Sequence, residues 1–263
     1  MFLAMSPVWL GILVVFGIFG SMLLLLEFGR RMGRRGRVID PEGAKAGLGT
    51  VDGAVFGLMG LLIAFTFSGA AARFDARRTA AVDEANAIGT SWLRLDLLPA
   101  AAQASIRPKL RDYTSARLEA FRKLPDMEAA RVESARANSL QQEIWRNAVA
   151  ACSETNSIPT AVLVLPALNQ MFDAASSRTI HAQMHPPLMI YQMLVLLVLA
   201  SSLLAGYGLG VGKVRNRFHA LAFTLTIMVT LLVILDFEFP RLGLIRLHTN
   251  DQIFVNQLEN MKP

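Results

Sequence analysis

The chain contains little charge and a single cysteine. Of its 263 residues, 17% are charged, and Cys152 is the only cysteine. One cysteine excludes an internal disulfide framework, and we expect Cys152 to be a small buried hydrophobe. The sequence is 53% hydrophobic, with a mean hydropathy of +0.42. Such an apolar composition is unusual for a soluble domain and typical of a polytopic membrane protein.

Recognised catalytic signatures are also missing. The sequence has no phosphate-binding loop ending in Lys-Ser/Thr, no nucleophile elbow and no HExxH motif. His181 and His185 are spaced i, i+4, so on a helix they would share a face and could hold a metal. Without a nearby Cys or carboxylate, we favour two histidines at a membrane boundary over a metal site. We therefore expect no enzyme activity, metal or cofactor.

Charged residues avoid four long segments, which predict four transmembrane helices. These segments cover residues 8–26, 53–72, 188–212 and 220–235. A span of about 20 apolar residues crosses a hydrocarbon core of roughly 30 Å. The residues between the second and third segments predict helices over 106–124 and 127–152, and a further helix that begins at Pro159.

The predicted fold is therefore all-α, with four transmembrane helices and an extramembrane helical bundle between the second and third. We divide the chain into residues 1–70 (two transmembrane helices), 71–187 (the bundle), 188–239 (two more transmembrane helices) and 240–263 (a short tail). The tail carries Ile253, Phe254, Leu258 and Met261, which predict an amphipathic turn on the membrane surface or on the bundle.

The longest predicted element extends from Gly49 to Leu98 as one helix, half in lipid and half in water. Its membrane half carries glycines at every fourth position, which would admit a close neighbouring helix: Gly49, Gly53 and Gly57. Its water half carries a narrow apolar seam typical of helix packing: Phe74, Ala81, Ala85, Ile88, Trp92 and Leu95. Arg78 is the polar residue that we place on this seam.

Part of this helix resembles a known family. The segment AFTFSGAAARFDARRTAAVDEANAIGTSWLRLDLLP is similar to the signature of the bestrophin-like domain of bacterial membrane proteins, and more remotely to bestrophin anion channels. A second similarity is DFEFPRLGLIRL, at Asp236 to Leu247. The resemblance implies an oligomeric ion channel, with anions as the expected ions, in which the second transmembrane helix lines the pore.

The apolar positions of that helix suggest where a pore would narrow. Ala54, Leu58 and Leu62 are spaced by four residues, with Phe65 beyond them, and would form a constriction of the dewetting kind. The alternative is a receptor or scaffold whose bundle binds a ligand or a partner protein. A lipid-modifying enzyme is a third alternative, which lacks a nucleophile–base pair.

A rim of charged side chains is predicted where the second and fourth spans leave the membrane. It consists of three arginines from the second helix and three residues that follow the fourth span: Arg73, Arg77, Arg78, Asp236, Glu238 and Arg241. Carboxylates near hydrocarbon need partners, and an arginine fork provides one. The rim is either a static clamp between helices or a charged vestibule that selects ions.

The sequence pI is near 10.0, but its basic residues do not indicate nucleic-acid binding. Nine lysines and arginines lie in two predicted short loops, at residues 30–45 and 213–217. By the positive-inside rule these loops are cytoplasmic, which places the bundle in the periplasm; an anionic-lipid or nucleotide patch is the alternative. The resemblance to bestrophins implies the opposite orientation. We expect a multi-pass protein of the bacterial inner membrane whose partners are lipid and further copies of itself.

Overall fold

The structure is a computed structural model that describes residues 7–46, 48–155, 157–212, 217–239 and 248–261. The chain forms two compact units. One contains residues 1–72 and 185–244, and the other contains residues 73–184 and 245–263. Each unit is considered by itself below.

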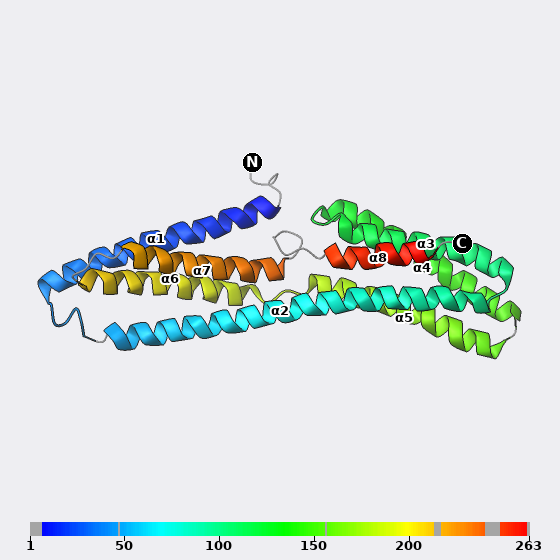
Figure 1. Cartoon of the computed structure of the whole chain (residues 1–263), viewed down its shortest axis with the longest axis horizontal. Coiled ribbons are helices and arrows are strands. Elements are labelled where there is room, and N and C mark those ends of the chain that lie inside the picture. Colours follow the sequence, from blue (N-terminus) through cyan, green and yellow to red (C-terminus); the bar gives the residue numbers. More distant parts are fainter. Residues whose placement is uncertain (1–6, 47, 156, 213–216, 240–247, 262–263) are drawn as a thin grey trace. The chain divides into compact units, whose positions relative to one another are not determined.

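All of the described elements are helical, which confirms the predicted class (Figure 1). They are α1 (Pro7–Ile39), α2 (Leu48–Arg94) with a short 3₁₀ turn at Leu95–Leu97, α3 (Ala100–Arg122), α4 (Met127–Thr155), α5 (Ile158–Gln183), α6 (Leu188–Val211), α7 (Arg217–Glu238) and α8 (His248–Asn260). Among the described residues, four segments are long and apolar enough to cross a membrane: Leu13–Ile39, Leu48–Leu97, Ile158–Val211 and Phe218–Glu238. The long helix predicted from Gly49 is therefore present as α2.

The first helix differs from the prediction. The basic segment after Leu26 was expected to be a loop, but α1 continues as a helix to Ile39. Ion pairs stabilise this extension, since Glu27 accepts hydrogen bonds from Arg30 at 2.7 and 2.8 Å. Arg37 then donates to the carbonyl oxygen of Gly212 at 2.7 Å, satisfying an orphan acceptor at the end of α6.

Close backbone packing between α1 and α6 explains why the helix continues. A Cβ atom built on Gly29 or Gly33 would collide with the carbonyl oxygen of Leu203 or Tyr207, respectively. The opposite helix is equally close, because a Cβ on Gly206 would collide with the carbonyl oxygen of Leu26. Small residues on both partners let the backbones touch, which is how transmembrane helices associate without a hydrophobic driving force.

The apolar core of this unit lies where α1, α2, α6 and α7 meet. Its buried members are Met22, Met59, Leu194, Val198, Ile227 and Leu231. An edge-to-face contact between Phe56 and Phe223, with ring centroids 6.1 Å apart, connects α2 to α7. One side of the membrane half of α2 therefore packs on its own chain.

The second unit combines the C-terminal half of α2 with α3, α4, α5 and α8. Ala81, Ala85, Ile88 and Leu95 are buried in its core, as the seam predicted, whereas Arg78 is exposed. Cys152 is buried there as well, and burial raises the pKa of its thiol.

Helix α8 resolves the two alternatives left open for the tail. Phe254 and Met261 are fully buried in the core of the second unit. Ile253 and Leu258 are partly buried against the same core. The amphipathic tail therefore packs on the bundle, where its apolar side chains replace water contacts with protein contacts.

Candidate functional site

The membrane half of α2 presents one uncovered apolar face. Ala54, Leu58 and Phe65 are all exposed, Leu58 and Phe65 with 53% and 68% of their surface accessible. Leu62 is instead partly buried against the core, and Leu61 is exposed in its place. A spacing of four residues advances about 400°, so each step drifts about 40° around the helix. The exposed set is therefore Ala54, Leu58, Leu61 and Phe65.

The predicted glycine stripe lies on a neighbouring sector of the same helix. Cβ atoms built on Gly49, Gly53 and Gly57 would meet nothing within 4 Å. Within the described part of one chain, these glycines thus face no neighbouring helix. A stripe without side chains makes few dispersion contacts with lipid and would let another helix approach closely.

Two of the predicted rim residues have partners within their own units. Arg77 is buried and donates from Nε to the carbonyl oxygen of His181 at 3.1 Å and from Nη2 to that of Met184 at 2.9 Å. It therefore caps the carbonyl end of α5, where a cation is favoured. Glu238 is fully buried, and its Oε1 lies 2.8 Å from Nδ1 of His185.

The remaining rim residues have different surroundings. Arg73 is partly buried and Arg78 is exposed, both in the second unit, whereas Asp236 ends the membrane part of α7 in the first unit. Arg241 lies outside the described residues. Pairing between these arginines and the acids stays a prediction.

The two histidines do not share a helix face. Helix α5 ends at Gln183, and residues 184–187 are not helical. His181 and His185 therefore do not lie on one helix, and their i, i+4 spacing does not bring them together. Pro186 and Pro187 explain the break, because proline disfavours a helical conformation at the residue before it. No group of three metal-ligating side chains occurs among the residues that the structure describes.

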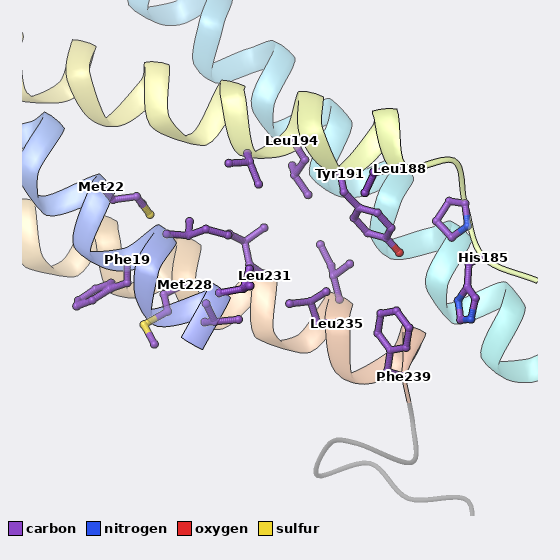
Figure 2. Close-up of a pocket in the computed structure, with 16 residues that line it drawn as sticks. Phe19, Met22, His185, Leu188, Tyr191, Leu194, Met228, Leu231, Leu235 and Phe239 are labelled. Carbon is purple, nitrogen blue, oxygen red and sulfur yellow. The ribbon is translucent and has the colours of Figure 1, made fainter. Parts of the chain in front are cut away.

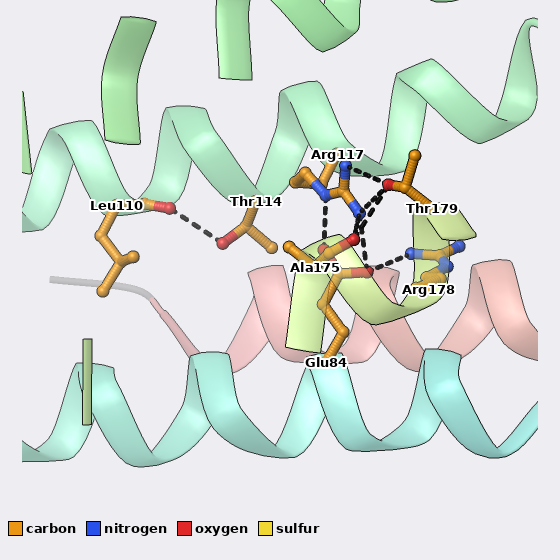
Figure 3. A network of polar contacts seen from close by, with 7 residues as sticks. All are labelled: Glu84, Leu110, Thr114, Arg117, Ala175, Arg178 and Thr179. Atoms are coloured by element: carbon orange, nitrogen blue, oxygen red, sulfur yellow. Dashed lines mark hydrogen bonds and ion pairs between the residues drawn. The ribbon is translucent and has the colours of Figure 1, made fainter. Parts of the chain in front are cut away.

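A buried carboxylate that the sequence did not single out organises the second unit (Figure 3). Glu84 of α2 has no exposed surface, and its Oε1 lies 2.5 Å from Nε of Arg117 on α3. Its Oε2 accepts from Nη2 of Arg117 at 3.2 Å and from Nη1 of Arg178 on α5 at 3.0 Å. Arg117 also donates to the carbonyl oxygen of Ala175 at 2.9 Å. One carboxylate thus connects three helices.

Aromatic rings surround the second guanidinium of this cluster. The Cζ atom of Arg178 lies 3.7 Å from the ring centroid of Phe121 and 4.4 Å from that of Phe254. Such cation–π contacts stabilise a desolvated guanidinium. Burial lowers the pKa of Arg117, but Glu84 opposes this more strongly in sum, and the pKa rises. Tyr113 lies nearby, and burial raises the pKa of its hydroxyl well above the usual value.

Sequence reasoning could have found Glu84 from spacing alone. Six of the buried positions from Arg77 to Leu95 follow alternating steps of four and three residues: Arg77, Ala81, Glu84, Ile88, Ser91 and Leu95. This is the a/d pattern of a heptad, and a polar residue recurs in it every seventh position. The seam that we predicted mixed these positions with half-buried Phe74 and Trp92.

Together, these features define a class of protein: an all-helical membrane protein whose second helix continues from an apolar unit into a helical bundle. The sequence profile of the Bestrophin-like domain matches residues 16–250. The chain therefore belongs to the bestrophin-like family.

Solved structures agree with this assignment at the level of the fold. Two point variants of a bacterial bestrophin homologue from Klebsiella pneumoniae match with TM-scores of 0.68 and 0.70, each at 16% sequence identity. The matches cover 91% and 92% of this chain and 97% and 98% of theirs. No protein of curated function matches this chain.

Proposed function

We propose that the protein is an oligomeric ion channel in which the membrane half of α2 lines the pore. The observation that carries the proposal is the uncovered face of α2, where Ala54, Leu58, Leu61 and Phe65 are exposed beside a glycine stripe. In a ring of copies the glycines would contact the next subunit, and the apolar face, roughly a quarter turn away, would face the axis. Membership of the bestrophin-like family supports the same arrangement.

Gating would then be a matter of wetting. A narrow pore lined by leucine and phenylalanine excludes water and ions, and conduction requires that it widen or become more polar. Anions are the expected ions, on the basis of the resemblance to bestrophin channels. A second site that selects among ions could lie on the water half of α2, where three charged residues are exposed: Asp75, Arg78 and Asp83.

The first test of the channel is ion flux. We expect Leu58→Thr to raise flux into liposomes about tenfold, because a barrier lowered by about 1.4 kcal/mol speeds passage by that factor. Leu221→Thr is the matched control, since Leu221 of α7 is equally exposed (54%) but lies on another helix. Chloride and sodium are measured separately. A parent protein that passes neither ion contradicts the channel.

Assembly provides the second arm of this test. Gly53→Leu should break the oligomer into smaller species, since a large side chain would separate the neighbouring backbones. Gly17→Leu is its control, because Gly17 on α1 also has nothing within 4 Å of an added Cβ. Particle images in detergent give the result: a ring with a central opening supports a channel. A parent monomer or two-fold dimer would favour the receptor or scaffold instead.

We further propose that the loops joining α1 to α2 and α6 to α7 are cytoplasmic and that the bundle is periplasmic. The support is the charge count, with nine basic residues at residues 30–45 and 213–217. Alkaline phosphatase fused after Leu140 should be active, and the same enzyme fused after Lys45 should be silent. The reverse pattern would reverse the assignment of sides.

A further inference from the structure

The membrane unit contains a cavity of about 430 Å³ between α1, α6 and α7 (Figure 2). Phe19 and Met22 line it from α1, Leu194 from α6, and Leu231 and Leu235 from α7. Its volume is in the range of small-molecule sites, which is about 300–1,000 Å³. The lining side chains are apolar except at one end, where His185 and Tyr191 contribute polar atoms.

The packing of α1 explains why this space exists. At the Gly29–Gly33 end, α1 touches the backbone of α6. At its other end, Cβ atoms built on Gly17 and Gly20 would meet nothing within 4 Å. Figure 1 shows α1 diverging from α6 in this direction. The two helices therefore form a wedge, and the cavity occupies its open part.

We propose that this cavity binds one acyl chain of a bilayer phospholipid. Water does not fit, because a buried water needs two to four polar partners and this lining offers almost none. An unfilled space would forfeit the dispersion contacts of every side chain around it. The three lining helices all belong to candidate membrane spans, so lipid acyl chains are the hydrocarbon that surrounds them.

The polar groups lie where an amphiphile would need them. His185 precedes α6, and its imidazole stacks on the ring of Phe239 with centroids 5.0 Å apart. The same imidazole contacts the carboxylate of Glu238 at the end of α7. These residues lie where α6 begins and α7 ends, which is the level of a lipid headgroup. The acyl chain would thus lie along α1 between Met22 and Val14, over about 12 Å at 1.5 Å per residue.

The parent protein decides the proposal directly. We expect native mass spectrometry to show one phospholipid per chain after detergent washing. Adding palmitoyl-oleoyl phosphatidylethanolamine to delipidated protein should raise its melting temperature, because a ligand of the native state stabilises it. Hexadecane and palmitic acid are separate arms. Loss of all phospholipid on washing, or stabilisation by hexadecane alone, would overturn the assignment.

Variants that fill the cavity locate the site. Val195→Phe should reduce retained phospholipid about tenfold, a free-energy change of about 1.4 kcal/mol, because Val195 lines the cavity. Leu196→Phe, on the neighbouring exposed position, should retain it. A second pair on α7 decides the matter if Val195→Phe does not fold. Met228→Trp fills the cavity, and Val229→Trp, on the neighbouring exposed position, is its control. Parental retention in the cavity variants would overturn the site.

Discussion

Replacing Glu84 with glutamine should cost the helical bundle about 3–5 kcal/mol of stability, the range measured when one member of a buried ion pair is removed. The carboxylate has no exposed surface and accepts from two guanidinium groups. Glutamine keeps the size of the side chain but removes the negative charge that faces the buried guanidinium groups of Arg117 and Arg178. We expect the melting temperature of the bundle to fall by roughly 10 °C.

Asp83→Asn is the matched control, because it removes one carboxylate from the adjacent, exposed position of the same helix. Its effect should stay within about 0.5 kcal/mol, as for most surface substitutions. Arg178→Gln should cost less than Glu84→Gln, since it leaves the ion pair between Glu84 and Arg117 in place. The double variant then measures the coupling. Additive losses, or equal losses in Glu84→Gln and Asp83→Asn, would show that the ion pairs do not stabilise the bundle.

The cluster also shows how far the sequence leads. The heptad spacing of α2 places Glu84 in the buried seam, and a carboxylate there must be paired. Its partners are 33 and 94 residues away along the chain. Such pairs depend on how α3 and α5 dock. No local pattern in α3 marks Arg117 among its other basic residues, and nothing local to α5 shows that Arg178 faces Glu84.

The membrane helices show a different limit. Hydropathy identified the apolar part of every span, because burial in lipid demands it. It failed for residues 27–39, where arginines suggested a loop and backbone packing of Gly29 and Gly33 maintains a helix. The four-residue spacing also placed Leu62 on the exposed face, where the structure has Leu61. Only the continuous drift of a 3.6-residue helix separates the packed face from the exposed one.

The second large effect is expected at Gly206, where α6 touches α1. A Cβ atom there would collide with the carbonyl oxygen, carbonyl carbon and Cα of Leu26, which are backbone atoms that cannot rotate away. Gly206→Ala should therefore separate the helices and cost about 1–3 kcal/mol, as overpacking does. Gly206→Leu should cost more and should prevent α1 from docking.

Gly208→Ala provides the control for this prediction, two residues further along the same helix. A Cβ on Gly208 would meet Asp52 Oδ2 at 3.7 Å, which is an ordinary contact. Both variants change glycine to alanine in α6, so their helix propensities change equally, and the difference between them isolates the helix contact. We expect Gly208→Ala to melt like the parent and Gly206→Ala to melt several degrees lower in detergent. Cysteines placed on the facing surfaces of α1 and α6 should also cross-link in the Gly208→Ala background and should not cross-link in the Gly206→Leu background. Equal melting of the two alanine variants would mean that α1 and α6 are not in backbone contact.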